Sequence, residues 1–382
     1  MTEKPSVLYS EYIIDGMPRA LTPARMLEEC SSGPAGHAPA RKPEPIIDET
    51  LDLAPSTYKF DSALIMTYLD LVKKQLEKKR HVPIHFADSY AAGKVAESLL
   101  DAIWMTGHFR MGDLTLKGDW PWDREPIGNM AAFYRSVEAA TGYIDELGVR
   151  LRSYSVLSGQ CSISFKAATT SEEEVTEDEE EIIIRELPFK TANPRIGRRR
   201  KCPSTFRPDN TDWLIYIPFD QCDYRLGGSL LAEATGSRSA LAPEISDADY
   251  FIDCYEVVRE LVEDGVVKAG TTVFEGGLMT ALDSMITEEV GASVSIDDIR
   301  RAYSDEKPVR ILFAEVPGVI IEIADIDYDY VDAELLLQDI AYFPLGHPNT
   351  KARELSVSTG EKPAISSILE SLLKSQTSEG ED

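Results

Sequence analysis

The sequence lacks any run of about 18 apolar residues, which is what a membrane-spanning helix needs. Its first residues also lack the basic and then apolar order of a signal peptide. We therefore expect no membrane partner and a cytoplasmic location. With 382 residues, of which 43% are hydrophobic, the chain has room for two ordinary domains with cores of their own.

Closely spaced cysteine pairs are also absent. Zinc ribbons and small disulfide scaffolds need such pairs, whereas the cysteines here are scattered along the chain at Cys30, Cys161, Cys202, Cys222 and Cys254. The histidines show no ligand spacing, and no catalytic histidine signature accompanies a cysteine. We expect reduced thiols and assign no catalytic residue.

Basic residues are few, since 39 Lys and Arg stand against 66 Asp and Glu and leave a net charge of -27. This argues against nucleic-acid binding, because phosphate backbones are held by clustered Lys and Arg. One basic cluster follows the acidic run 172–181 and consists of Arg195, Arg198, Arg199, Arg200 and Lys201. A solvated loop whose two halves attract each other is favoured, and a phosphate-binding patch is the alternative.

Composition divides the chain into five segments. The first is rich in Pro, Gly, Ser and Ala and is predicted to be a flexible arm with one short helix after Thr22-Pro23. Helices and strands alternate in two later segments, which predicts an α/β (α+β) fold in two halves. The segments are a Pro-rich arm at 1–57, a first half at 58–170, a charged loop at 171–204, a second half at 205–348, and a polar tail with a short amphipathic helix at 349–382.

Hydrophobic periodicity predicts the individual elements. Apolar residues at helical spacing predict helices at 60–79, 91–105, 129–148, 229–236, 250–265 and 276–291. Short apolar runs predict strands at 81–88, 149–156, 161–167, 213–219, 309–315, 318–325 and 340–346. Trp104, Trp120 and Trp122 are interpreted as core or lid residues, because no basic residues alternate with them as in a base-stacking surface.

Several motifs follow one another in a fixed order. The second half contains DYRLGGSLLAE at 223–233, FEGGLMTAL at 274–282 and LFAEVPGVII at 312–321, and the first half contains GNMAAFY at 128–134 and SGQCSIS at 158–164. Together they resemble the aminoimidazole ribonucleotide synthetase superfamily, in particular the second synthetase-type domain of the phosphoribosylformylglycinamidine synthases. The resemblance covers about residues 58–348. It implies a two-half synthetase-type fold whose N-terminal sheet pairs with a like domain.

The same resemblance implies a site for Mg²⁺ and ATP or ADP. Glu97 and Asp101 are four residues apart on a predicted helix and so point the same way, and magnesium prefers carboxylate and phosphate oxygens. Such a pair taken alone is usually a solvated helix face. The family pattern matches it to metal ligands and adds Asp61 and Glu275, which makes Asp61, Glu97, Asp101 and Glu275 the predicted metal set.

Two glycine pairs are candidate phosphate contacts. Glycine allows a close backbone approach and positive φ, so the nucleotide-binding residues are predicted to be Gly227, Gly228, Ser229, Gly276 and Gly277. A simple strand-to-helix turn explains the glycines equally well, and both interpretations stay open here.

The chain departs from the family pattern at two places. Gln160 and Cys161 stand where relatives have a lysine and a carboxylate, and Thr271-Thr272 replaces a His-Asp pair. A neutral glutamine cannot supply the point charge of lysine at a phosphate. These losses put catalysis by the isolated chain in doubt.

Two functions therefore remain open. The chain is either a phosphoribosylformylglycinamidine synthase-like subunit of purine biosynthesis, acting in ATP-dependent conversion of an amide to an amidine, or a catalytically silent nucleotide-binding or interaction protein derived from that family. The resemblance implies a homodimer, or a heteromer with another synthetase-like domain, together with a glutaminase subunit. An uncovered sheet would otherwise be prone to aggregate.

Overall fold

The computed structural model describes residues 7–32 and 60–359, except 79, 108, 127, 170–171, 178–180, 187–195, 197–198, 238–240 and 305. Most of the predicted N-terminal arm, the tail helix at 365–374, and Arg195 and Arg198 of the basic cluster lie outside the described residues. No described helix is long and apolar enough to cross a membrane.

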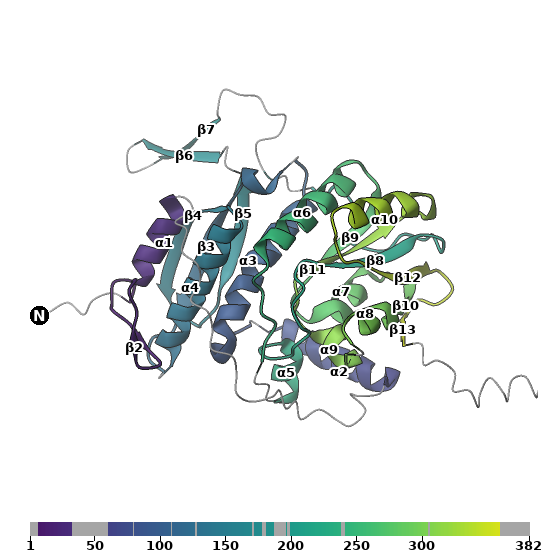
Figure 1. Ribbon diagram of the computed structural model, residues 1–382, viewed down its shortest axis with the longest axis horizontal. Coiled ribbons are helices and arrows are strands. Elements are labelled where there is room, and N and C mark those ends of the chain that lie inside the picture. The colour runs from purple at the N-terminus through teal and green to yellow at the C-terminus, as the bar shows by residue number, and fades with distance from the viewer. Residues whose placement is uncertain are drawn as a thin grey trace, which may run out of the picture.

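The first half is built on a three-stranded sheet in the order β4-β3-β5, with β3 (Leu114–Trp122), β4 (Arg150–Ser158) and β5 (Ser164–Thr169). β3 pairs in parallel with β4 and antiparallel with β5. One side of the sheet is covered by α1 (Pro23–Ser32), α3 (Ala87–Ile103) and α4 (Asn129–Glu146) (Figure 1). Because α4 joins β3 to β4, it supplies the crossover that parallel strands require. A small hairpin, β1 (Ile13–Ile14) and β2 (Met17–Pro18), precedes α1.

Aromatic side chains fill the core of this half. Trp104, Trp120 and Trp122 each have 0% of their surface exposed. Trp120 packs edge-on against Phe165, with ring centroids 5.2 Å apart. The Trp122 Nε1–H donates to the carbonyl of Asn129 at 2.9 Å, so its polar atom is satisfied inside the core. The core role predicted for these tryptophans is confirmed.

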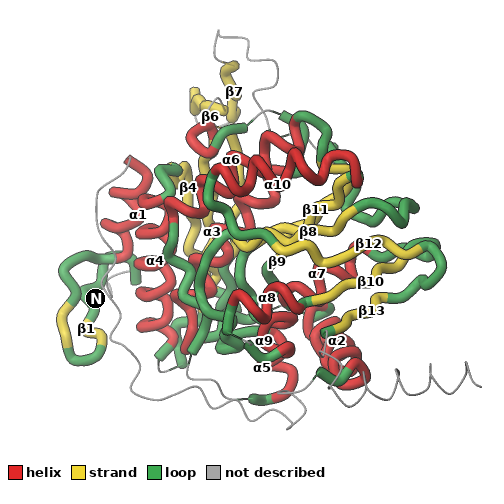
Figure 2. Tube along the Cα trace, turned by 45° about the vertical axis from the view of Figure 1, so that its right-hand side comes forward, coloured by secondary structure: helices red, strands yellow, loops and turns green. Residues whose placement is uncertain are grey.

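The second half contains a six-stranded sheet in the order β13-β10-β12-β8-β11-β9. Its strands are β8 (Trp213–Pro218), β9 (Val267–Val273), β10 (Gly291–Ser295), β11 (Gly318–Ile323), β12 (Phe343–Asn349) and β13 (Leu355–Ser358). All its pairs are antiparallel except β10 with β13. Figure 2 shows β8, β12, β10 and β13 following one another across the sheet.

Alternate residues of the central strand β8 enter two different cores. Ile215 and Ile217 pack with α6 (Ala248–Glu263), together with residues of the first half. Leu214 and Tyr216 pack on the opposite face with residues of α7 (Gly277–Met285). This period of two is expected of a strand buried on both faces.

Short helices complete the second half: α5 (Leu230–Thr235), α8 (Asp297–Ala302), α9 (Pro308–Phe313) and α10 (Tyr328–Leu337). The helix α2 (Ser62–Leu76) lies in the predicted first half, 58–170, yet its buried residues Ile65, Leu69 and Val72 belong to the core on the α7 face. The two halves are therefore packed together through α6 and α2.

Two predicted strands are wrong. Residues 309–313 belong to the helix α9, which begins at Pro308. Proline is favoured in the first helical turn because the N–H that it lacks would have no partner within the helix there. Within 81–88, Ile84–Phe86 form a 3₁₀ turn, η2, and Ala87 and Asp88 begin α3. All six residues of α9, Arg310 among them, are buried, and a short, mostly apolar run does not distinguish a buried helix from a buried strand.

Part of the predicted charged loop forms an antiparallel hairpin. β6 (Glu172–Glu177) pairs with β7 (Glu181–Glu186), with Glu172 opposite Glu186. In Figure 1 this hairpin lies beyond the sheet of the first half. The assignment of 171–204 as a loop therefore needs correction over these two strands, where Ile182, Ile183 and Ile184 form a β-branched run that favours strand.

Glu322 is a carboxyl group inside the second sheet, and its stability effect is testable. It has 0% of its surface exposed, and both carboxyl oxygens accept from the Arg207 backbone N–H, at 3.2 and 3.1 Å. Burial raises the pKa of Glu322 to about 8; the nearby Asp212 carboxyl also raises it, and the Arg207 N–H opposes the shift. A pKa above that of an unfolded glutamate means that the protonated form stabilises the folded protein, and that this contribution is lost as the pH rises.

We expect the melting temperature of the wild type, relative to that of Glu322→Gln, to fall between about pH 5 and pH 8. Thermal unfolding followed by circular dichroism checks this. Glu354→Gln, at an exposed carboxylate, serves as the control and should track the wild type. Parallel pH profiles for Glu322→Gln and the wild type would contradict the prediction.

Candidate functional site

A buried glutamate, Glu315, joins the two glycine turns. It lies between α9 and β11 with 7% of its surface exposed. Its Oε1 accepts the backbone N–H of Leu230, at the start of α5, and of Gly276, before α7, each at 3.0 Å. A carboxylate is stabilised at such helix N-termini because their first N–H groups have no partner within the helix. Glu315 therefore fixes the beginnings of two helices at one point.

Arg80 is the cation that faces this carboxylate. Its Nη2 donates to Glu315 Oε2 at 2.7 Å and to the carbonyl of Gly228 at 2.8 Å, and its Nη1 lies 3.2 Å from Glu275 Oε1. The guanidinium packs over the Tyr90 ring, 4.7 Å from its centroid. Burial alone would lower the pKa of Arg80, but Glu315, Tyr90 and Glu275 outweigh it and the net shift is upward.

Lys94 bridges two of the predicted metal ligands. Its Nζ lies 2.5 Å from Glu97 Oε2, one turn along α3, and 3.2 Å from Glu275 Oε1. The Tyr90 hydroxyl donates to the same Glu275 oxygen at 3.0 Å. Burial raises the pKa of Glu97 to about 7, although Lys94 opposes the shift. For Glu275 the attraction of Lys94 and Arg80 exceeds the effect of burial, so its pKa is lowered.

Asp101 belongs to a separate hydrogen-bonded chain. The Thr272 hydroxyl donates to Asp101 Oδ1 at 2.7 Å, and the Trp104 Nε1–H donates to the Thr272 oxygen at 2.9 Å. Burial raises the pKa of Asp101. Arg200 stacks on Trp104 and donates to the carbonyl of Gly270 at 2.7 Å.

Asp61 has a local role. It is the N-cap of α2, and its Oδ1 accepts the Leu64 backbone N–H at 3.2 Å. This bond satisfies one of the orphan donors of the helix. Within the part of the chain that the structure describes, no group of three or more His, Cys, Asp or Glu side chains is arranged to hold a metal ion.

The predicted phosphate-binding residues form tight, internally bonded turns. Gly228, Gly276 and Gly277 have φ of 76°, 78° and 74°, which favours glycine. A Cβ on Gly277 would lie 2.7 Å from the Leu312 carbonyl oxygen, and one on Gly227 would lie 2.1 Å from that of Leu241. Turn geometry and close packing thus account for these glycines.

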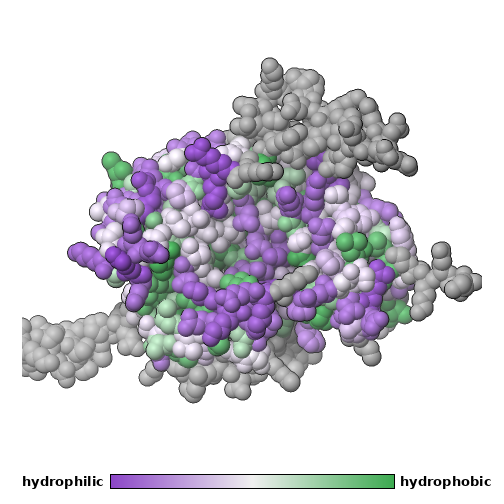
Figure 3. Space-filling view, turned by 180° about the vertical axis from the view of Figure 1, so that it is seen from behind, coloured by the Kyte–Doolittle hydropathy of each residue, from purple (hydrophilic) through white to green (hydrophobic). Residues whose placement is uncertain are grey.

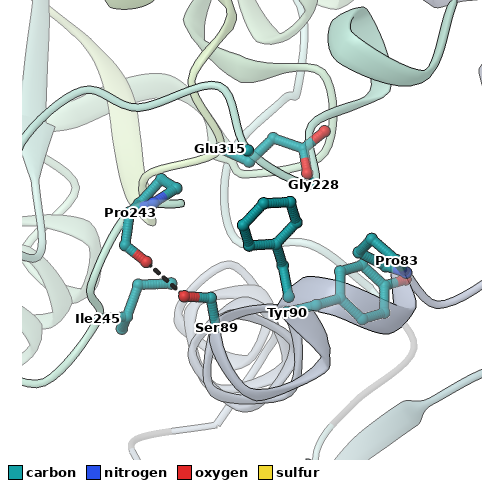
Figure 4. A pocket seen from close by; sticks show the side chains of 9 residues that line it. Pro83, Ser89, Tyr90, Gly228, Pro243, Ile245 and Glu315 are labelled. Atoms are coloured by element: carbon teal, nitrogen blue, oxygen red, sulfur yellow. Dashed lines mark hydrogen bonds between the residues drawn. The ribbon is translucent and has the colours of Figure 1, made fainter. Parts of the chain in front are cut away.

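Ser229 completes the first of these turns by capping α5. Its Oγ accepts the Ala232 N–H at 3.2 Å. Figure 4 shows Gly228, Tyr90 and Glu315 around the small cavity beside this turn, which has a volume of about 20 Å³. The space is close to that of a single water molecule.

A larger cavity lies between α3 and β5 and has a volume of about 390 Å³. We call it the α3–β5 cavity. Its polar lining consists of Lys94, Glu97, Ser98, Asp101, Ser164, Lys166 and Arg200. Glu97 and Asp101 therefore share one helix face, as their spacing predicts, and that face borders a cavity. Figure 3 views the molecule from behind, where hydrophilic and hydrophobic residues are interspersed.

A second cavity, of about 520 Å³, lies at the substituted motif of the first half. It is lined by His81, Asn129, Gln160 and Cys161, among others, and the Gln160 Nε2 lies 2.6 Å from the His81 Nε2. Burial raises the pKa of the Cys161 thiol, which disfavours a thiolate there.

Sequence reasoning missed the cations and the hub of this site. The sequence analysis assigned no site role to Arg80, Lys94 or Tyr90. It included Glu315 only as part of the motif at 312–321. Lys94 precedes Glu97 by three residues, a spacing that places both on one helix face, and this signal was available. Nothing near Arg80 in the sequence indicates that it reaches Glu315, 235 residues later.

Comparisons with known proteins point to one kind of enzyme. The chain is 24% identical over 262 residues to the probable phosphoribosylformylglycinamidine synthase, chloroplastic/mitochondrial, of Arabidopsis thaliana. This alignment covers 66% of this chain and 17% of the relative. It is 25% identical over 236 residues to the Homo sapiens phosphoribosylformylglycinamidine synthase, covering 62% of this chain and 16% of the relative. The chain is similar in sequence to the phosphoribosylformylglycinamidine synthases. The resemblance inferred from the motifs is confirmed.

The synthase relatives are much longer than the matched region, since the chain spans only about one sixth of their length, 16% to 17%. No family model matches the chain. Among solved structures, PurLQS from Thermotoga maritima aligns with a TM-score of 0.47 and 12% identity, over 71% of this chain and 39% of that one. Escherichia coli HypE, a hydrogenase maturation protein, aligns with a TM-score of 0.43 and 10% identity, over 71% of this chain and 76% of that one. The predicted mixture of helices and sheets in two halves is confirmed by the arrangement of the elements.

We expect Arg80 to contribute several kcal/mol to the free energy of unfolding. Replacing it by Met leaves Glu275 and Glu315 buried without their shared cation, and loss of one partner from a buried pair costs about 3–5 kcal/mol. Urea unfolding of Arg80→Met checks this. Arg135→Met is the matched control: its ion pair with Asp15 has side chains that are 38% and 71% exposed, so the loss should be about 0–1 kcal/mol. Equal losses in the two variants would contradict the assigned role of Arg80.

Proposed function

We propose that this chain supplies one synthetase-like domain to a phosphoribosylformylglycinamidine synthase reaction in purine biosynthesis, the ATP-dependent conversion of an amide to an amidine. The observation that carries the proposal is the set of curated matches. They name this synthase in a plant, a nematode, a human and a fly, at 24% to 25% identity over 60% to 66% of this chain. The match spans only 16% to 17% of each relative, which supports a domain-sized contribution that needs further domains.

The α3–β5 cavity is the place we propose for the nucleotide. Its volume of about 390 Å³ is within the usual range of ligand pockets, about 300–1,000 Å³. The cations Lys94 and Arg200 border it, as does the hydroxyl of Ser98. Ammonium and guanidinium groups with hydroxyl donors suit phosphate oxygens. The predicted residues Glu97 and Asp101 lie in the same lining.

The glycine turns enter this proposal as supports. The Gly276 N–H already donates to Glu315, and the Gly227 N–H to the Leu241 carbonyl at 2.8 Å. Backbone donors that have protein partners are not available to a phosphate without breaking those bonds. We therefore assign the phosphate contacts to side chains of the cavity.

Direct binding of Mg²⁺ by the predicted carboxylates is not part of the proposal. Glu97 and Glu275 share Lys94, Asp101 accepts from Thr272, and Asp61 caps α2. One oxygen of each carboxylate thus already has a protein partner, and the ammonium beside Glu97 and Glu275 repels a hard cation.

The partner surface we propose is the side of the β4-β3-β5 sheet that faces away from α1, α3 and α4. Its residues include Lys117, Asp119, Ser155 and Leu157, and the Leu157 side chain is 63% exposed. A sheet covered on one side only presents a surface that a like domain can cover. A homodimer, or a heteromer with another synthetase-like domain and a glutaminase, is the expected assembly, in the cytoplasm.

Nucleotide binding can be tested at one arginine of the cavity. Arg200→Ala should weaken ADP or ATP binding by about tenfold, because one charge-assisted hydrogen bond contributes about 1.5 kcal/mol. Isothermal titration calorimetry measures this. Arg135→Ala is the matched control, since the Arg135 side chain is 38% exposed and does not line the cavity. Equal affinity in both variants, or no binding by the wild type, would reject the α3–β5 cavity as the nucleotide site.

The synthase role needs an activity measurement. Amidine formation from formylglycinamide ribonucleotide, ATP and ammonium is followed with the chain alone, and again after adding the first synthetase-like domain and glutaminase of a long-form synthase. We expect turnover only in the second mixture, because Gln160 and Thr271-Thr272 replace charged residues of the family pattern. Omitting this chain from that mixture is the control. Equal turnover without it, or none in either mixture, would remove the synthase role in favour of a catalytically silent module.

A further inference from the structure

We infer that the Lys94 ammonium takes the place of a divalent cation between Glu97 and Glu275, so that this carboxylate pair binds no metal ion. The Lys94 Nζ lies 2.5 Å from one carboxylate and 3.2 Å from the other. Glu97 and Lys94 belong to α3 in the first half, whereas Glu275 precedes α7 in the second. A covalently attached cation thus performs the bridging that the family resemblance assigns to an exchangeable one.

The Glu275 carboxylate explains why a metal ion does not fit beside Lys94. Its Oε1 accepts from Lys94 and from the Tyr90 hydroxyl, and Arg80 Nη1 lies 3.2 Å from the same atom. Magnesium requires oxygen ligands at about 2.0–2.1 Å in near-octahedral geometry. An ion at that distance from Glu275 Oε1 would lie next to an ammonium and a guanidinium, both of which repel it.

The local charges are balanced by protein groups. The carboxylates of Glu97, Glu275 and Glu315 face the cations of Arg80 and Lys94, and Glu315 also accepts N–H groups at the starts of α5 and α7. Partly positive helix N-termini stabilise the remaining negative charge. The side chains of Arg80 and Lys94 are 8% and 14% exposed, so water has little access to the hydrogen bonds that they make with the carboxylates. Little negative charge is therefore left in the cluster to attract an added cation.

The remaining predicted ligands do not alter this balance. Asp101 is turned to Thr272, and Asp61 caps its own helix. Lys94 also lines the α3–β5 cavity, so it cross-links the two halves beside the proposed nucleotide site. The inference concerns the protein without nucleotide, and it can stand or fall separately from the proposed function.

Manganese binding tests the inference, because Mn²⁺ prefers the same oxygen ligands as Mg²⁺ and its free form is counted by electron paramagnetic resonance. The titration uses the full chain without nucleotide. Wild type, Glu97→Gln and Glu275→Gln should bind the same amount of Mn²⁺, through exposed acidic residues only. Glu354→Gln, at an exposed carboxylate, controls for that background. A wild-type site that disappears in Glu97→Gln or Glu275→Gln, and not in Glu354→Gln, would overturn the inference.

Lys94→Met provides the second arm. Without the ammonium, Glu97 and Glu275 should gain one Mn²⁺ site, and Mn²⁺ should raise the melting temperature of Lys94→Met and not that of the wild type. The site should be lost again in the double variant Lys94→Met, Glu97→Gln. A folded Lys94→Met that gains no site would show that the ammonium is not what excludes the ion. If Lys94→Met does not fold, the comparison of the wild type with Glu97→Gln and Glu275→Gln decides the question alone.

Discussion

The hydrogen bonds and ion pair of Glu315 hold the centre of this molecule together. One carboxylate receives the first backbone N–H groups of two helices and a guanidinium from a residue far away in the sequence. A buried carboxylate without partners would cost many kcal/mol, so each of these elements must be in place before the others are stable. The glycine turns before α5 and α7, the end of α9 and the Arg80 segment consequently form one unit.

This constraint also shapes the chemistry of the neighbouring site. Arg80 is held by Glu315 and reaches Glu275, Glu275 holds Lys94, and Lys94 holds Glu97. Positive charge is therefore fixed next to the carboxylates, at the edge of the α3–β5 cavity. The charges at this cavity are therefore placed by side chains that the fold itself requires.

Much of the architecture follows from periodicity. Apolar spacing predicts the positions of the helices α3, α4, α6 and α7 and of the strands β8 and β11. A long periodic segment is predicted well because only one secondary structure places its apolar residues on a single face. Short segments were harder to assign to helix or strand. Residues 311–314 form a short apolar run, and only the surroundings decide whether such a run is a helix or a strand. The strand β3 contains Gly118 and Pro121 and was not predicted, because both residues weaken a strand pattern.

The properties of the candidate site also divide into those that the sequence determines and those that the tertiary structure determines. The residues alone decide which groups carry charge, that Glu97 and Asp101 share a helix face, and that the glycine motifs make turns, because each of these properties depends on local geometry or side-chain chemistry. Only the tertiary structure decides the partners: Lys94 between Glu97 and Glu275, Thr272 at Asp101, and Arg80 at Glu315. Burial makes those choices, since a charge removed from water must be paired with whichever group the packed chain brings within hydrogen-bond distance.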